Sequence, residues 1–368
     1  MNNTIHTTQY FSSISSQHGK TPPDPHSTQN TAKKSGFLYA AIGLFLGLVP
    51  RIVSADESTN NSDPAKAAAV STTKQFCVFD PSGTMGDAYK TAQKFATQSG
   101  TWGTNLKLKA YQDEAVAARD FLNKKCDAVM LTGVRTQQMN RKTFSIEAIG
   151  LLSSYDDLKQ SIALLARPKA AKLSKNGEFE TAAFFPGGQV YLFVRDRNNA
   201  DVSKLAGKKI ATLSFDEASR AMVSHVGATP ITADTGTFAS LFNEGSVDAC
   251  YAPALAYAPF ELSRGIGKKG GIIRYTLANM TFQVVIHANE FPSDFGQKSR
   301  EWSTTQFSSM VDVLNRTEAA IPKKNWIDIP EEASARYDSM LREVRHKLAK
   351  SGTYDATMVR LLEQLRSK

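Results

Sequence analysis

The residues of this chain that could do chemistry lie mostly on loops that follow short apolar runs. Asp80 follows residues 76–79, and Thr132 and Arg135 follow residues 127–131. If such runs form a parallel sheet, a ligand lies beyond the carboxyl ends of the strands. Guanidinium, carboxylate, hydroxyl and aromatic groups at those ends can hold a small molecule. The candidate ligand-binding residues are Asp80, Tyr111, Thr132, Arg135, Tyr191, Phe215, Asp216, Tyr251 and Tyr257.

Each candidate also has a purely structural interpretation, and the sequence leaves both interpretations open. Arg135 could pair with a nearby acid on the surface. Asp80 could stabilise a turn and Asp216 a helix N-terminus, where short acidic side chains accept backbone N–H groups. The aromatic candidates could be core or hinge residues instead of ligand contacts.

The motifs of common enzymes are missing from the sequence. It contains no G-x-S-x-G, no G-x4-G-K-[ST] and no H-E-x-x-H. The glycine-rich residues 265–271 do not follow a strand and open a helix, as dinucleotide binding requires, and therefore predict a flexible turn. His225, His287 and His346 are far apart, which argues against a metal centre. We expect no catalytic residues, no cofactor and no metal.

From residue 75 onward, short apolar runs alternate with helical patterns, which predicts βαβ units and a mainly parallel sheet. Ser214 and Glu217 predict a capping box at the start of one helix, and Gly245 predicts the end of the next. The apolar spacing after residue 302 predicts long C-terminal helices. The expected strands are residues 76–79, 106–111, 127–131, 146–152, 190–194, 247–251 and 282–286.

The amino terminus has the pattern of a secretory signal. Lysines precede an apolar run at residues 37–49, and small residues precede Asp56. At about 1.5 Å per residue this run is shorter than the roughly 30 Å hydrocarbon core, which argues against a retained anchor. We expect a signal peptide at residues 1–55, cleavage near Ala55, a disordered leader at residues 56–73 and a periplasmic protein.

The positive charge of the chain is not arranged for nucleic acid. The formal net charge is +9, but Lys and Arg are scattered and interleaved with acids. A nucleic-acid-binding protein usually collects its positive charge in a stripe that also carries aromatic residues. The charge pattern therefore predicts a solvated surface and no nucleic-acid partner.

The three cysteines are too few for a disulfide framework. Cys77 and Cys126 belong to the expected first and third strands, which are neighbours in a doubly wound lobe. An oxidising periplasm would permit a bond between them. A disulfide and two buried free thiols both remain open, while Cys250 is most simply a small core residue.

Three motifs occur in a characteristic order: KLAGKKI at residues 204–210, GATP at residues 227–230 and GSVDA at residues 245–249. This order resembles the second lobe of the solute receptors of tripartite ATP-independent periplasmic (TRAP) transporters, the DctP-like proteins. In that family a leu-x-gly-x-lys-ile strand precedes a gly-ala-x-pro turn and a gly-x-val-asp strand. The resemblance implies a receptor for a small molecule.

The resemblance covers about residues 76–314. Residues 75–81 and 126–135 are similar to a divergent proteobacterial branch of solute-binding proteins, whose members are sometimes described as efflux-pump components. The residues themselves give no basis for a pump activity.

The resemblance implies an α/β fold of the two-lobed, type II-like periplasmic-binding-protein kind, with hinge strands and long C-terminal helices. The expected first lobe is residues 74–190 and 286–314, and the second is residues 191–285. The expected helices that pack on both lobes are residues 315–368. Such a receptor would capture a small molecule in the cleft, with an organic acid as one candidate, and deliver it to permease subunits of a secondary transporter. A ligand-sensing or envelope-complex role with the same fold is the alternative.

One departure from the TRAP pattern concerns the ligand. TRAP receptors usually end the gly-leu-lys-ile strand with an arginine that grips a carboxylate through two hydrogen bonds. Here that position is Ala211. Either Arg135 replaces the missing arginine, or the ligand is not a simple carboxylate.

Overall fold

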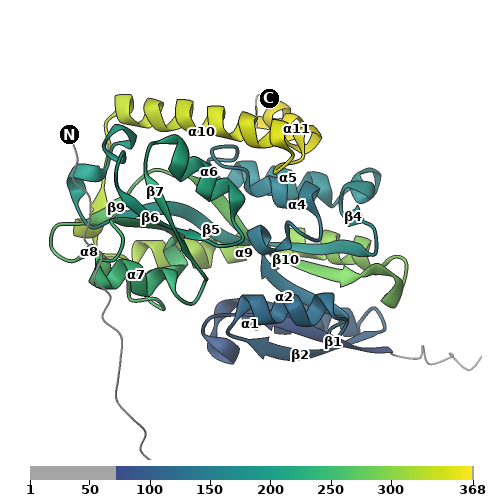
Figure 1. Ribbon diagram of the computed structural model, residues 1–368. Coiled ribbons are helices and arrows are strands. Elements are labelled where there is room, and N and C mark those ends of the chain that lie inside the picture. The colour runs from purple at the N-terminus through teal and green to yellow at the C-terminus, as the bar shows by residue number, and fades with distance from the viewer. Residues whose placement is uncertain (1–71, 367–368) are drawn as a thin grey trace, which may run out of the picture. The chain divides into compact units, whose positions relative to one another are not determined.

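The computed structural model describes residues 72–366, which Figure 1 shows in colour. The predicted signal peptide and its cleavage site lie outside the described residues, as does nearly all of the predicted leader. Among residues 72–366, none of the helices combines the length and the apolar character that a membrane crossing requires.

The first lobe is built around three parallel strands. β1 (Thr72–Phe79) pairs with β2 (Thr104–Tyr111) on one side and with β3 (Ala128–Thr132) on the other. Helices α1 (Asp87–Gly100) and α2 (Glu114–Leu122) connect these strands and pack against them. The apolar run of β1 is continuous because both of its faces are covered. Three further helices are α3 (Gly133–Thr136), α4 (Arg141–Phe144) and α5 (Tyr155–Leu165).

The second lobe has the same βαβ organisation. β6 (Lys209–Leu213) pairs in parallel with β7 (Thr229–Ala233) and with β8 (Ala249–Pro253). Helices α6 (Glu217–His225) and α7 (Phe238–Glu244) connect these strands. The smaller elements around them are α8 (Leu262–Ile266), β9 (Gly271–Ile273) and β11 (Trp326–Ile327).

Two long antiparallel strands connect the lobes. β5 (Phe179–Val194) pairs with β8, and β10 (Ala278–His287) pairs with β3 and β5, so the sheet runs in the order β2-β1-β3-β10-β5-β8-β6-β7. Between the lobes Gly188 has a φ of +110°, and the register of β10 shifts between Met280 and Thr281. These irregularities mark the hinge strands. The short strand β4 (Lys175–Asn176) extends the other end of β5.

Three helices complete the fold. α9 (Phe295–Ala319) packs along β5, α10 (Glu331–Ser351) against α6, and α11 (Ala356–Arg366) against α5 (Figure 1). The buried side chains of α10 and α11 share one apolar core with residues of both lobes, such as Leu158 and Ile210. The α10–α11 pair therefore joins the two lobes.

The strand predicted at residues 146–152 is wrong. Ser145–Glu147 is a 3-10 helix, and turns follow it. Ile146 and Leu151 are buried in the same apolar core as the residues of α11. A short apolar run has the same pattern whether helices or sheet neighbours bury it.

The predicted capping box at Ser214 is also wrong. Asp216 is the N-terminal cap of α6, and its carboxylate accepts the N–H of Ser219 at 3.0 Å. Ser214 instead donates its hydroxyl to Asp234 at 2.8 Å. The prediction of a helix ending at Gly245 is confirmed by its left-handed φ of 85°.

Candidate functional site

A cavity of about 120 Å³ lies where the two lobes meet the segment between α10 and α11. Val134 and Ile149 line it from the first lobe, Leu213 and Met222 from the second, and Tyr354 from the C-terminal segment. An apolar cavity with a few convergent polar groups is the usual form of a small-molecule site. The polar side chains on its wall are Glu147, Asp216, Ser219, Asn279, Tyr251 and Tyr354.

Glu147 lies at the end of the 3-10 helix Ser145–Glu147 and is 5% exposed. One of its carboxylate oxygens accepts the backbone N–H of Thr281 at 2.6 Å and also the Thr281 hydroxyl. A Cβ atom at Gly133 would lie 1.9 Å from that oxygen, so this position admits only glycine without a shift. The pKa of Glu147 is raised to about 8, mainly by burial and also by the nearby carboxyls of Asp216 and Glu114, while the hydrogen bonds from Thr281 act in the opposite direction.

Asp216 lines the cavity from the second lobe. As the N-terminal cap of α6 it uses one carboxylate oxygen for the N–H of Ser219. It is 8% exposed, and burial raises the pKa of its carboxyl group. Glu147 and Asp216 therefore line the same cavity, one from each lobe, and the Asp216 carboxyl contributes to the raised pKa of Glu147.

Two polar atoms in the cavity wall have no hydrogen-bond partner. Asn279 is 1% exposed, and its amide nitrogen donates to the carbonyl of Leu152 at 2.8 Å while its Oδ1 bonds to nothing. The hydroxyl of Tyr251 is also buried and without a partner. A buried polar group without a partner costs about 1 to 3 kcal/mol, so these two atoms are unfavourable features of the structure as it stands.

Arg135 has partners within the protein. It lies on α3, its Nε is 3.6 Å from a carboxylate oxygen of Glu114, and its guanidinium carbon is 3.2 Å from the centroid of the Phe215 ring. Glu114 is 1% exposed and accepts hydrogen bonds from Thr132 and, at 3.2 Å, from the hydroxyl of Thr235. Phe215 and Thr235 belong to the second lobe, so Arg135 and Glu114 hold the two lobes together. Arg135 is not among the residues that line the cavity.

Residues 98–368 match the family model described as Solute-binding protein AdeT 1/2. The chain belongs to this family. The probable solute-binding protein AdeT1 of Acinetobacter baumannii is 39% identical to it over 291 residues, which are 79% of this chain and 96% of the relative. The probable solute-binding protein AdeT2 of the same organism is 26% identical over 222 residues, or 60% and 93% of the two chains. Members of the AdeT 1/2 family are solute-binding proteins and not enzymes.

The fold of this AdeT 1/2 family member matches TRAP periplasmic solute-binding proteins of known structure. One from Haemophilus influenzae, with bound L-gulonate, has a TM-score of 0.65 at 10% identity and covers 79% of this chain and 99% of its own. One from Ralstonia eutropha, with bound (S)-2-acetolactate, has a TM-score of 0.64 at 13% identity and covers 79% and 98%. At these identities the likeness concerns the fold, and it confirms the predicted two-lobed TRAP-receptor architecture with long C-terminal helices.

Most of the residues predicted for the site of this AdeT 1/2 member have internal partners instead. Asp80 accepts the N–H groups of Ser82 and Tyr89 at 2.8 and 3.0 Å, as a turn residue does. Three predicted tyrosines use their hydroxyl groups for hydrogen bonds within the protein. Tyr111 donates to Asp120 at 2.8 Å, Tyr191 donates to Glu318 at 2.8 Å, and Tyr257 accepts from Asn325 at 2.7 Å. Of the predicted set, Asp216 and Tyr251 line the cavity. Ligand contact by the others stays a prediction.

The cavity is also lined by four residues that are not among the predicted ligand-binding residues: Glu147, Asn279, Phe144 and Tyr354. Glu147 carried a usable signal, because it is a lone acid inside the apolar residues 146–152. Asn279 lies just before the predicted hinge strand, and Tyr354 is far away in the C-terminal segment. Periodicity does not indicate that either one faces the same cavity.

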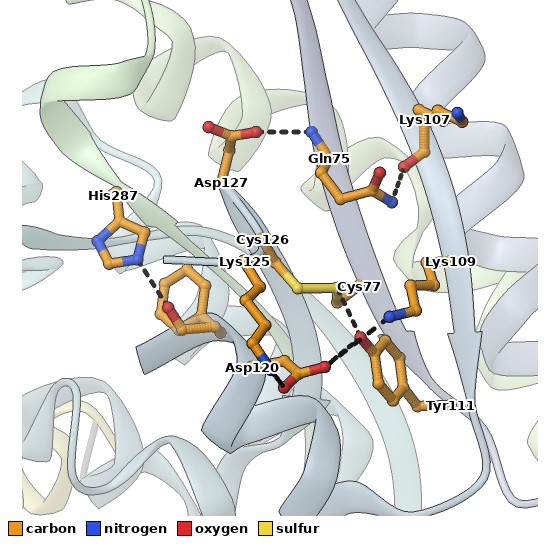
Figure 2. Close-up of a disulfide and its surroundings, with 11 residues drawn as sticks. Gln75, Cys77, Lys107, Lys109, Tyr111, Asp120, Lys125, Cys126, Asp127 and His287 are labelled. Atoms are coloured by element: carbon orange, nitrogen blue, oxygen red, sulfur yellow. Dashed lines mark hydrogen bonds and ion pairs between the residues drawn. A yellow bond between two sulfur atoms is a disulfide. The ribbon is translucent and has the colours of Figure 1, made fainter. Parts of the chain in front are cut away.

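Figure 2 shows the disulfide between Cys77 on β1 and Cys126 just before β3. The two Cα atoms are 5.9 Å apart, and Tyr111 and Asp120 lie beside the bridge. Of the two interpretations that the sequence left open, the structure has the bridge, and Cys250 is a buried free thiol. Across residues 72–366, no group of three or more His, Cys, Asp or Glu side chains is placed to hold a metal ion.

Proposed function

We propose that the protein is a periplasmic receptor that captures a small molecule in the cavity between its lobes and delivers it to membrane permease subunits. The observation that carries the proposal is the mainly apolar cavity of about 120 Å³, which is lined by residues of both lobes and has the carboxyl groups of Glu147 and Asp216 on its wall. An apolar cavity with a few polar groups between two lobes is the usual form of a site that closes around a small molecule.

Closure by a hinge supports the same function. The two crossing strands carry their irregularities between the lobes, at Gly188 and at Met280. Hinges are commonly a few residues that absorb large backbone changes. We propose that residues 74–190 and 286–314 move as the first lobe and residues 191–285 as the second. The predicted boundary before residue 315 falls inside α9, and we place it after Ala319.

The periplasmic location is supported by two features of different kinds. The chain has the sequence pattern of a cleaved signal before Asp56. The Cys77–Cys126 disulfide suits an oxidising compartment. Mass spectrometry of the protein from a periplasmic extract should find an amino terminus near Asp56, whereas an intact leader in the membrane fraction would contradict this location.

A thermal-shift screen against carboxylic acids, amines and neutral polyols tests the capture of a ligand. Compounds that raise the melting temperature are then titrated by calorimetry, and solution scattering should show a smaller radius of gyration with ligand. The variant Val134→Trp fills the cavity and should lose binding. Val313→Trp on α9 is the matched control, because Val313 is 37% exposed and does not line the cavity.

The screen can refute the receptor function. If no compound of any class binds, or if the compounds that bind do so equally well to Val134→Trp, the cavity is not a ligand site. Binding that is lost in Val134→Trp and kept in Val313→Trp supports the proposal.

A further inference from the structure

The charged groups on the cavity wall are both acids. Glu147 comes from the first lobe and Asp216 from the second, and no Lys, Arg or His side chain is among the described residues that line the cavity. Arginines nearby are engaged elsewhere: Arg220 donates to the carbonyls of Leu213 and Ser214, and Arg345 donates to Ile149 and Glu363. Arg135 is paired with Glu114. The cavity wall therefore carries two acids and no basic side chain, and the charge of Arg220 acts on Asp216 from outside the wall.

Two buried carboxyl groups are costly when both are ionised. A carboxylate ligand would add a negative charge beside these two acids, and Glu147 would then have to keep its proton. A cationic ligand would supply the charge that Glu147 and Asp216 lack, and a buried charge-assisted hydrogen bond is among the stronger polar contacts. The electrostatics of this wall thus favour a positive ligand over a negative one.

The remaining wall suits an organic cation and not a metal ion. Three aromatic side chains, Phe144, Tyr251 and Tyr354, line the cavity, and the rings of Phe144 and Tyr354 lie 5.4 Å apart at an angle of 37°. Aromatic faces attract ammonium groups. Among the described residues, no group of three or more His, Cys, Asp or Glu side chains is placed to hold a metal ion, at this wall or elsewhere.

From these observations, and resting on the receptor function proposed above, we propose that the cavity binds an organic ammonium ion with a small apolar body, whose charge is held between Glu147 and Asp216. In this arrangement the ammonium group lies between one acid of each lobe, so that its binding draws the lobes together. The apolar part of the ligand packs against Ile149, Met222 and the aromatic side chains.

Compounds that share a ring and differ in charge test this proposal. Cyclohexylamine is the cation, cyclohexanol the neutral analogue and cyclohexanecarboxylate the anion, and choline is added as a quaternary ammonium ion. Calorimetry on the mature protein purified after export should show binding of at least one ammonium compound. We expect cyclohexanol to bind at least tenfold more weakly than the amine and cyclohexanecarboxylate not to bind.

Conservative variants identify the groups that hold the charge. Glu147→Gln keeps an oxygen that can accept from Thr281, and Asp216→Asn keeps the helix cap. Each should weaken ammonium binding by roughly ten- to a hundredfold while changing the affinity for cyclohexanol little. Glu261→Gln is the matched surface control, because the side chain of Glu261 is 65% exposed and pairs with Arg264, and it should bind like the wild type.

The outcomes separate this inference from the proposed function. One outcome is that a carboxylic acid binds, that this binding is lost in Val134→Trp, and that no amine binds. The receptor function then stands and the ammonium inference is overturned. Ammonium binding that is unchanged in both Glu147→Gln and Asp216→Asn also overturns it. If nothing binds from any class, the receptor function itself fails.

Discussion

The guanidinium carbon of Arg135 lies 3.2 Å from the centroid of the Phe215 ring, and these two residues belong to different lobes. The same arginine is paired with Glu114, which accepts a hydrogen bond from Thr235 of the second lobe. An arginine that stacks on an aromatic ring and pairs with a buried acid is held in place by both contacts. We therefore expect Arg135 to stabilise this arrangement of the two lobes, while its predicted contact with the ligand stays a prediction.

Replacing Arg135 by alanine is therefore expected to destabilise the protein and to favour the open form. Glu114, which is 1% exposed, would lose its ion-pair partner, at a cost of roughly 3 kcal/mol. The melting temperature should fall, and the radius of gyration without ligand should rise. Ligands of every charge should bind more weakly. Arg264→Ala, an exposed arginine paired with Glu261, is the control. Weakening confined to acidic ligands would instead identify Arg135 as the anion-binding group.

The stability of the protein should depend on pH through Glu147. Burial raises the pKa of this residue from 4.5 to about 8, so between these values the native state holds a proton that the unfolded state has released. Stability due to this group is then fully present at low pH and falls as the pH rises through this range, by up to about 1.4 kcal/mol per unit. Urea unfolding across the range should show a smaller fall for Glu147→Gln than for the wild type. Equal slopes would refute the buried, protonated state of Glu147.

Ammonium binding at neutral pH is expected to release a proton. The groups that face Glu147 are Thr281, Asp216 and Glu114, of which the two acids raise its pKa and Thr281 lowers it. A bound cation should favour the ionised form. Calorimetric titrations in two buffers with different ionisation enthalpies measure the number of protons released. The number of protons released should be greater for the wild type than for Glu147→Gln. An equal number would contradict a direct contact between the ammonium group and Glu147.

Reduction of the Cys77–Cys126 disulfide should lower the stability of the first lobe. The bridge closes a loop with a sequence separation of 49 residues, for which chain entropy predicts roughly 4 kcal/mol. A reducing agent should lower the urea midpoint of the wild type but not that of a Cys77→Ala, Cys126→Ala double variant. Cys250→Ala should keep the sensitivity to the reductant, because Cys250 is not bridged. A wild type that is insensitive to full reduction would contradict a stabilising role.

Gly133→Ala should disturb the cavity without a change of charge. The new Cβ atom would lie 1.9 Å from the carboxylate of Glu147, which must then move away from Thr281. Ligand affinity should fall at least tenfold if the moved carboxylate no longer contacts the ligand, because a loss of about 1.4 kcal/mol in the free energy of binding corresponds to a factor of ten. Gly236→Ala is the matched control, since nothing lies within 4 Å of its added Cβ. Equal affinities of the two variants would show that the position of Glu147 does not matter.

More of the fold than of the cavity could be predicted from the sequence, because strands depend on local apolar patterns. The strands of the first lobe follow from continuous apolar runs, because a parallel strand covered on both faces needs them. The start of β5 could not be predicted, since Pro186, Gly187 and Gly188 interrupt its pattern and are tolerated only where β10 shifts register. Residues 146–152 were misinterpreted because an apolar segment that packs between α11 and β10 without joining the sheet has the same pattern as a buried strand.

The site could be predicted only in part. Asp216 follows β6 and Tyr251 is one of the last three residues of β8, so the rule for the carboxyl ends of strands selects them. Glu147, Asn279 and Tyr354 reach the cavity through a 3-10 helix, a hinge strand and a C-terminal segment. These elements meet only in three dimensions. The partner of Arg135 was missed for the same reason, because Glu114 is 21 positions away along the sequence.

The apolar core that α10 and α11 share with both lobes limits the amplitude of any opening motion. Leu158 of α5 and Ile210 of β6 belong to this core, as does Leu348 of α10. Pulling the lobes fully apart would expose that surface to water, at roughly 25 cal/mol for each Å². We therefore expect any opening of the lobes to be a rotation about the C-terminal helices, in which the contacts of this core persist while the contact between Arg135 and Phe215 breaks.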